Sequence, residues 1–269
     1  MLAKPDRLSK CQSLKEKTFQ ECQLGCDEGY TSSGTCDCMV AYRRQAVAIL
    51  AGVPDEYINY GIDSYPGSQK LSSDKRVLGV KGWMTRYVQN MEENLRENLG
   101  LLIVGPYGTG KTALLSVAMM EAMNVLFPYN EGPLGYYTTA SEMLLAVGGG
   151  THDFREPIYA LKDFVDCGVL LIDDLGKEFV VSSGGIRTDY SKFGMVLDAV
   201  LRERVSRKLI TFMSSNYSLK EIGEQYGNSC LEAIKIGMYP MSFSTDYPNL
   251  RDHSSLSAKQ KVARIYEDN

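Results

Sequence analysis

The sequence lacks any long hydrophobic run. No stretch of about 18 apolar residues, the length that crosses a bilayer as a helix, occurs in the chain. The first residues, Met-Leu-Ala-Lys-Pro-Asp-Arg, lack the apolar core of a secretion signal. Internal repeats and low-complexity tracts are also missing. These absences argue against a membrane span, and we expect a soluble, cytoplasmic protein.

The sequence also lacks an excess of positive charge. It has 29 basic and 33 acidic side chains, which give a formal net charge of −4. Proteins that attract nucleic acid through their overall charge are basic. Any contact with nucleic acid must therefore come from a local group of basic residues.

The length and the composition leave room for one large domain and a small appendage. Of the 269 residues, 44% are hydrophobic, which is enough for a sizeable core. A turn-rich stretch around Gly61, Pro66 and Gly67 separates two parts of different composition. We predict an N-terminal module at residues 1–50, a linker at 51–75 and the main domain at 76–269.

Cysteines are concentrated at the N-terminus. Five of the seven fall in the first 38 residues, and an odd total without a secretion signal argues against a disulfide framework. Two closely spaced pairs, separated by nine residues, suit a tetrahedral Zn²⁺ site that would stabilise a small module. Free thiols are the alternative, and Cys11 could replace one of the four ligands. The predicted zinc ligands are Cys22, Cys26, Cys36 and Cys38.

Residues 105–112 read Gly-Pro-Tyr-Gly-Thr-Gly-Lys-Thr, between the apolar run 101–104 and a helical pattern at 112–125. This is the setting of a phosphate-binding loop, whose glycines let backbone N–H groups point at phosphates. Lys111 can reach the outer phosphates, and Thr112 can hold Mg²⁺. A chance glycine-rich turn would not carry all these features. The predicted nucleotide contacts are Gly105, Tyr107, Gly108, Thr109, Gly110, Lys111 and Thr112.

A second signature is the run Val-Leu-Leu-Ile-Asp-Asp at 169–174. Its apolar part predicts a central parallel strand, whose carboxylates emerge at the C-terminal end where α/β sheets bind ligands. We predict that Asp173 meets Mg²⁺ through its water shell and that Asp174 orients or deprotonates the attacking water. The alternative is an aspartate pair that caps the next helix.

Another strand is predicted at 209–213, after a basic helix at 192–207, and it ends in Ser-Ser-Asn. Asn216 is placed to contact the γ-phosphate or the lytic water, or else to cap a helix from Ser218. Further predictions are a strand at 135–139 and a helix at 141–147. A helix that starts near 72–74 is expected to end at Gly100.

Together these residues resemble the AAA+ ATPases, and within them the bacterial replicative-helicase loaders of the DnaC/DnaI type and their relatives, the IstB-type transposition ATPases. The resemblance runs from about residue 51 to residue 251. It rests on Gly52-Val53-Pro54 with Tyr57, the loop at 105–112, Ile172-Asp173-Asp174-Leu175-Gly176, Ser214-Ser215-Asn216-Tyr217-Ser218-Leu219, Gly237-Met238 and Asn249-Leu250-Arg251.

The resemblance implies an α/β fold, with an AAA+ P-loop core of parallel sheet flanked by helices and a reduced or absent C-terminal lid. It implies an ATPase that uses ATP and Mg²⁺, self-associates through this core and acts in a bacterial or phage-infected cell. The cysteine-rich module resembles the zinc-binding, helicase-contacting domain of DnaI-type loaders. By position, the catalytic roles fall to Lys111, Asp173, Asp174, Asn216 and Arg251.

Two functions follow from the resemblance. The first is ATP-dependent loading of a ring-shaped, hexameric replicative helicase onto single-stranded DNA. The alternative is an IstB-like ATPase that assembles on duplex DNA and regulates transposition. The cysteine module favours the first, because the transposition relatives generally begin with a helical DNA-contact segment.

The sequence departs from the loader pattern at one place. Loaders usually carry a Ser-Arg pair shortly before Gly-Met, and its arginine reaches the ATP of a neighbouring subunit. Here residues 230–236 contain no arginine. Arg202, Arg204 and Lys235 are candidates for that role, or each is a solvated surface charge. Single-stranded DNA contacts are expected from Arg202, Arg204, Arg207 and Lys208.

Overall fold

The protein is described here from a computed structural model. It describes residues 5–22, 26–27, 29–31, 34–65, 73–127, 134–147, 157–177, 180–182, 185–187 and 190–250. Among the helices in these ranges, none combines the length and the apolar character that a membrane span requires.

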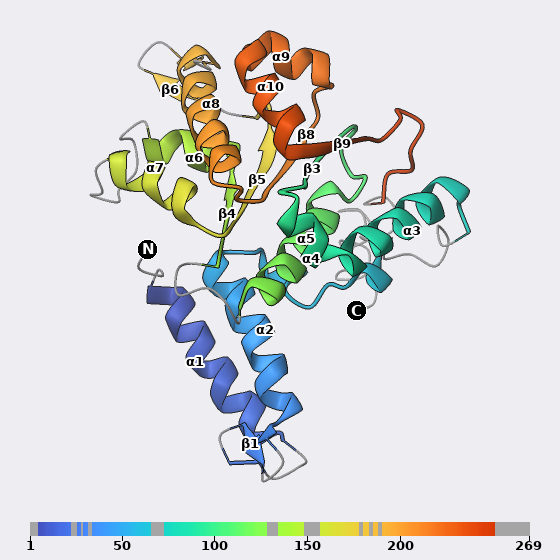
Figure 1. Cartoon of the computed structure of the whole chain (residues 1–269), viewed down its shortest axis with the longest axis vertical. Helices are drawn as coiled ribbons and strands as arrows, with labels where there is room; N and C mark the ends of the chain where they lie inside the picture. The colour runs from blue at the N-terminus through green and yellow to red at the C-terminus, as the bar shows by residue number, and fades with distance from the viewer. Residues whose placement is uncertain are drawn as a thin grey trace, which may run out of the picture.

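A five-stranded parallel sheet lies at the centre of the described chain (Figure 1). Its strands are arranged in the order β4-β5-β8-β3-β9. Neighbouring strands that are far apart in the sequence are joined by crossovers that contain helices, as parallel pairing requires. The bounds are β3 Gly100–Val104, β4 Gly135–Thr139, β5 Val169–Leu175, β8 Thr211–Ser215 and β9 Met238–Ser242.

The central strands are apolar throughout because both faces of the sheet are covered. Along β3, Leu101 and Ile103 belong to one core cluster, while Leu102 and Val104 belong to the other. Side chains that alternate across a strand thus supply two separate cores. The first is packed by α2, α3 and α5, and the second by α6–α10.

Helices cover both faces, and two further hairpins complete the described elements. The first core has α2 Asp37–Ala51, α3 Lys75–Gln89, α4 Met91–Arg96 and α5 Lys111–Leu126, with the 3₁₀ turns η1 Asp55–Tyr57 and η2 Ile62–Ser64. The second has α6 Ala140–Val147, α7 Pro157–Asp166, α8 Tyr190–Ser206, α9 Leu219–Tyr226 and α10 Asn228–Gly237. The hairpins are β1 Tyr30–Thr31 with β2 Gly34–Thr35, and β6 Val180–Ser182 with β7 Gly185–Arg187.

The N-terminal part forms an arm (Figure 1). Helices α1 Pro5–Gln20 and α2 lie side by side, with the β1–β2 hairpin at the end that is remote from the sheet. The other end of α2 packs into the first core through Ala48 and Ala51. An ion pair of 2.9 Å between Arg44 and Glu121 joins α2 to α5. The arm is therefore attached to the helix that follows the predicted phosphate loop.

Most predicted elements agree with the structure to within two residues, but the helix expected to end at Gly100 does not. It breaks at Asn90, between α3 and α4, and Gly100 begins β3 instead. A Cβ atom at Gly100 would lie 1.9 Å from the carbonyl oxygen of Thr211 on β8. Glycine is required there for strand approach, which the sequence pattern did not distinguish from a helix stop. Asp74 caps the start of α3.

The domain boundaries predicted at residues 50 and 75 stay predictions. Residue 50 lies near the end of α2, and residue 75 is the first of α3. The expectation of a reduced or absent lid stays a prediction, because the C-terminal segment 252–269 lies outside the described residues.

Candidate nucleotide-binding site and cysteine cluster

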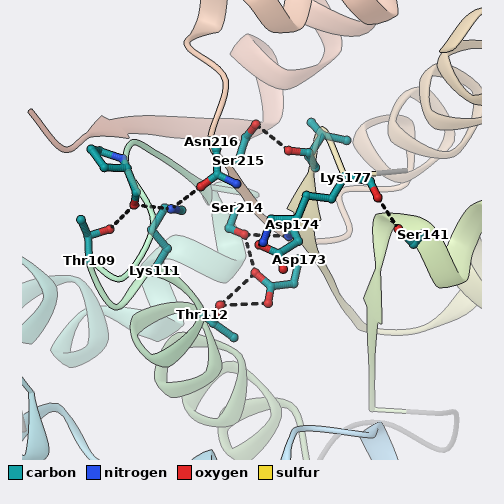
Figure 2. Close-up of polar contacts among 12 residues, drawn as sticks. Thr109, Lys111, Thr112, Ser141, Asp173, Asp174, Lys177, Ser214, Ser215 and Asn216 are labelled. Carbon is teal, nitrogen blue, oxygen red and sulfur yellow. Dashed lines mark hydrogen bonds and ion pairs between the residues drawn. The ribbon is translucent and has the colours of Figure 1, made fainter. Parts of the chain in front are cut away.

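The glycine-rich loop connects β3 to α5, at the C-terminal edge of the sheet (Figure 2). Gly108 and Gly110 have φ values of 76° and 83°, in the left-handed region that favours glycine. A Cβ atom at Gly108 would lie 1.9 Å from the side-chain oxygen of Asn249. The backbone N–H of Leu250 donates to the carbonyl of Gly108 at 2.7 Å. The glycines therefore permit both the tight turn and its packing against 249–250.

Lys111 is fixed inside this loop (Figure 2). Its side chain is buried, and its ammonium donates to the carbonyls of Gly105 and Pro106 at 2.9 and 2.8 Å. A third hydrogen bond, of 2.9 Å, joins it to Oδ1 of Asn216 at the end of β8. A buried cation held by oxygen acceptors at the start of a helix makes a strong site for an anion.

Asn216 lies in the pocket and is not a helix cap. Ser218 caps α9 through a capping box with Glu221, which excludes the alternative considered from sequence. Nδ2 of Asn216 is buried and has no hydrogen-bond partner among the described residues. A buried donor without an acceptor is rare in folded proteins, and here it suits a phosphate oxygen of a bound nucleotide.

Asp173 and Thr112 meet as a Mg²⁺ site requires (Figure 2). The Thr112 hydroxyl lies 2.9 Å from Oδ2 of Asp173. The Asp173 carboxylate also accepts hydrogen bonds from Tyr137 on β4, at 2.8 Å, and from Ser214 on β8. Desolvation, together with the charge of Asp173, raises the pKa of Tyr137, so this phenol stays a donor. Hydroxyl and carboxylate oxygens are the ligands that Mg²⁺ prefers, and these residues fit the ion.

Asp174 is turned toward the pocket by unusual backbone geometry. Its φ is 59°, in the left-handed region that non-glycine residues rarely adopt, and its N–H donates to Ser214 at 2.9 Å. The carboxylate is paired with Lys177 at 2.8 Å. The next helix that the structure describes begins only at Tyr190, so Asp174 is not the cap of an adjacent described helix.

Part of the pocket wall comes from the segment before the main domain. Tyr57 and Tyr60 line the pocket with Leu250. Tyr65 is buried, its hydroxyl donates to the Thr109 carbonyl at 3.0 Å, and it lies 2.7 Å from the Tyr247 hydroxyl. Tyr60 and Tyr65 were not predicted as site residues from the sequence, because single aromatic residues in a turn-rich stretch give no periodic signal.

The structure brings the four predicted zinc ligands together at the end of the arm. The Sγ atoms of Cys22, Cys26, Cys36 and Cys38 all lie within 4.8 Å of one another. Two of the separations are 3.3 and 3.7 Å. Tetrahedral zinc with Zn–S bonds of about 2.3 Å places its sulfur ligands about 3.8 Å apart. The cluster fits zinc.

Cys11 is not part of this cluster. It is buried between α1 and α2, where its thiol lies 3.7 Å from the carbonyl oxygen of Ala46.

Within the cluster, desolvation and the neighbouring thiols raise the pKa of Cys38. A bound cation would reverse that effect, because zinc favours the thiolate form of its ligands.

The predictions that Arg204 reaches a neighbouring subunit or contacts DNA are wrong. Its side chain is fully buried, so it can neither reach a neighbouring subunit nor contact DNA. Arg202 is exposed and paired with Asp198 at 3.0 Å, and Lys235 is exposed and paired with Glu232 at 2.7 Å. These two remain candidates for the trans-acting role. Arg251, assigned to the site by resemblance, lies outside the described residues.

Comparisons with known proteins show which solved structures share this fold. No family model matches the chain, and a search of curated proteins found no match. Among solved structures, the DnaC helicase loader aligns with 71% of this chain and 100% of its own, with a TM-score of 0.51 and 20% identity. The structure of DnaI aligns with 74% of this chain and 95% of its own, with a TM-score of 0.54 and 19% identity. The chain therefore shares its fold with the DnaC and DnaI structures.

Proposed function

We propose that this chain is an ATPase that loads a ring-shaped replicative helicase onto single-stranded DNA. One observation carries the proposal: a pocket lined by the glycine-rich loop and a four-thiol cluster occur together on a chain with the fold of the DnaC helicase loader. The first would supply an ATP-driven change of state, and the second would supply a rigid surface for the helicase.

In this proposal each pocket residue has a separate role in ATP binding or hydrolysis. The loop amides and Lys111 hold the phosphates, Thr112 and Asp173 hold Mg²⁺, and Asn216 contacts the terminal phosphate. When bound, Mg²⁺ neutralises charge on the phosphates. Asp174 orients or deprotonates the attacking water. The nucleoside would be contacted by the other residues that line the pocket, Tyr57, Tyr60 and Leu250.

Replacing Lys111 by alanine is expected to weaken ATP binding about 30-fold, equivalent to about 2 kcal/mol for a lost charge-assisted contact. Lys111 is the buried cation at the centre of the loop, and its ammonium donates to three uncharged oxygens. Titration of the purified protein with a fluorescent ATP analogue, in the presence of magnesium, measures the effect.

Lys220→Ala is the matched control, because Lys220 is exposed and forms an ion pair with Glu224 at 3.5 Å. That variant is expected to bind ATP like the wild type. Unchanged ATP affinity in a folded Lys111→Ala variant would remove the loop from the nucleotide site.

The cysteine cluster leads to a prediction about zinc and the helicase together. We expect one zinc ion per chain, and we expect Cys26→Ser to lose both the metal and the binding of a purified replicative helicase. Removal of one thiolate from a tetrahedral site opens it to water, and a small metal-stabilised module then unfolds. Metal analysis of protein purified without added zinc, followed by a helicase pull-down, measures both.

Cys11→Ala is the control, because Cys11 lies on the same arm but outside the cluster. It should keep its zinc and its helicase binding. A wild-type protein that carries zinc but ignores the helicase, and that assembles on duplex DNA with ATP, would favour the IstB-like alternative instead.

Single-stranded DNA would be contacted by the assembled core. The exposed basic residues near the end of α8 are Arg202, Arg207 and Lys208, and buried Arg204 is withdrawn from this group. Arg207 is paired with Asp166 and Glu203. DNA binding through this group would therefore have to displace existing ion pairs, which predicts a modest, salt-sensitive contact.

A further inference from the structure

Lys177 is a cation of the nucleotide pocket that the sequence analysis did not select. It follows β5 directly and lines the same pocket as Lys111, Asp174 and Asn216. Its Nζ atom lies 2.8 Å from Oδ1 of Asp174. Nζ also lies 4.7 Å from the centre of the Tyr107 ring, within the range of a cation–π contact. The ammonium is thus held between the predicted water-activating acid and the phosphate loop.

The backbone of Lys177 is fixed on two sides (Figure 2). Its N–H donates to the Asp174 carbonyl at 3.2 Å, and its carbonyl accepts from the Ser141 hydroxyl, on α6, at 2.6 Å. The side chain retains 30% of its exposure, so its end can change partner while its origin stays in place. A fixed backbone with a flexible four-carbon side chain is suited to exchange between two nearby acceptors.

The negative charge on each acceptor determines whether the Lys177 ammonium pairs with Asp174 or with a phosphate. In the structure, the Asp174 carboxylate is the anion that pairs with Lys177. A bound triphosphate adds several negative charges on oxygens that the same ammonium can contact. The pair with Asp174 is partly exposed and therefore weak, whereas a contact with a phosphate held inside the pocket is stronger.

We propose that Lys177 distinguishes ATP from ADP. Its ammonium pairs with the Asp174 carboxylate when no terminal phosphate is present, and it moves to that phosphate when ATP binds. The exchange frees the Asp174 carboxylate to orient water only when there is a phosphate to cleave. This inference rests on the proposed ATPase function and adds a positioning residue to it. Lys177 needs no group from a neighbouring subunit for this role.

The first test compares ATP and ADP affinities by calorimetric titration in magnesium. Lys177→Met should weaken ATP about tenfold, the effect of losing one charge-assisted contact to phosphate, and should leave ADP within twofold. Lys177→Arg should keep most of the preference for ATP. Equal effects on both nucleotides, or none, would overturn the proposal, because a merely structural lysine would not discriminate between them.

The second test isolates the exchange. Asp174→Asn relieves repulsion of the terminal phosphate in any background, but only with Lys177 present does it also release the ammonium. We therefore expect it to tighten ATP binding about threefold more in the wild-type background than in Lys177→Met, the size of a partly exposed ion pair. Equal tightening in both backgrounds would mean that Asp174 and the phosphate do not compete for Lys177.

Failure of the inference can be separated from failure of the ATPase proposal. A wild-type chain that binds no ATP would overturn both. A wild-type chain that binds ATP, whose Lys177→Met variant keeps the full preference over ADP, would overturn only the role of Lys177. Thermal unfolding of each variant excludes misfolding, and Lys177→Gln supplies a second neutral side chain of similar length.

Discussion

Replacing Asp174 by asparagine is expected to slow ATP cleavage about 1000-fold while ATP still binds, within the range for loss of a general base. The carboxylate lies at the C-terminal end of β5 and lines the pocket beside Lys111. Asparagine has nearly the same shape and tolerates the left-handed backbone at this position, where φ is 59°. The substitution therefore removes the charge without adding strain.

Single-turnover measurement of phosphate release, at saturating ATP, checks this prediction. Glu224→Gln is the control, since Glu224 is an exposed acid paired with Lys220 and does not line the pocket. Cleavage within tenfold of wild type in Asp174→Asn would assign the water-activating role to another residue.

Replacing Arg204 by alanine is expected to lower the free energy of unfolding by about 4 kcal/mol, the size of effect seen when a buried hydrogen-bond network is broken and a cavity is left. The guanidinium donates to backbone carbonyls of four residues before β5, to one carbonyl before β8 and to the hydroxyl of Thr211. These carbonyls belong to Phe164, Val165, Cys167, Gly168 and Ile210.

Burial lowers the pKa of Arg204, yet an arginine stays charged at neutral pH. Carbonyls at the C-terminal end of α7 carry partial negative charge and compensate for it. Without the side chain these buried carbonyls would lose the guanidinium donors, although Ile210 would still accept from the N–H of Leu170.

Urea denaturation measures the loss of stability, with Arg202→Ala as the control. Arg202 lies two residues away on the same helix, is exposed, and pairs with Asp198. Its removal is expected to cost less than about 1 kcal/mol, as for surface ion pairs in general. Similar stabilities for the two variants would show that the Arg204 network contributes little. Arg204→Met, which keeps the volume but not the donors, would separate the cavity from the hydrogen bonds.

The nucleotide site could be predicted from sequence because its signals are local. The glycine loop, the apolar strand before it and the aspartates after β5 each occupy a few consecutive residues. Parallel strands place their C-terminal ends at one edge, so the encounter of Thr112, Asp173 and Asn216 follows from topology. The four cysteines were found for a similar reason, since soft ligands in two short turns have few other roles.

Arg204 was misjudged although a signal was available. Phe193, Leu197, Val200 and Leu201 are buried on one face of α8, and Arg204 continues the same spacing of three or four residues. Its charge led to the prediction of a surface residue, whereas its position marked the buried face. A cation in register with an apolar stripe indicates a hydrogen-bonded network as readily as a surface contact.

Lys177 could not be selected from sequence in this way. It follows the Asp-Asp-Leu-Gly run in a loop without periodicity, and its importance comes from the direction of its side chain. That direction is set by the turn from Asp174 and by the contact with Ser141 on α6, which is 36 residues away in the sequence. Contacts of this kind depend on the assembled fold.

Because α2 is held in the core at one end, the arm can move as a rigid lever with the thiol cluster at its free end. One unbroken helix of 15 residues, about 22 Å long, begins beside Cys36 and ends in the core beside α5. It has no internal hinge where a movement could be absorbed. A tilt of about 10° at the end held in the core would displace the thiol end by about 4 Å, from the rise per residue of an α-helix. Small movements of α5 would thus be magnified at the tip.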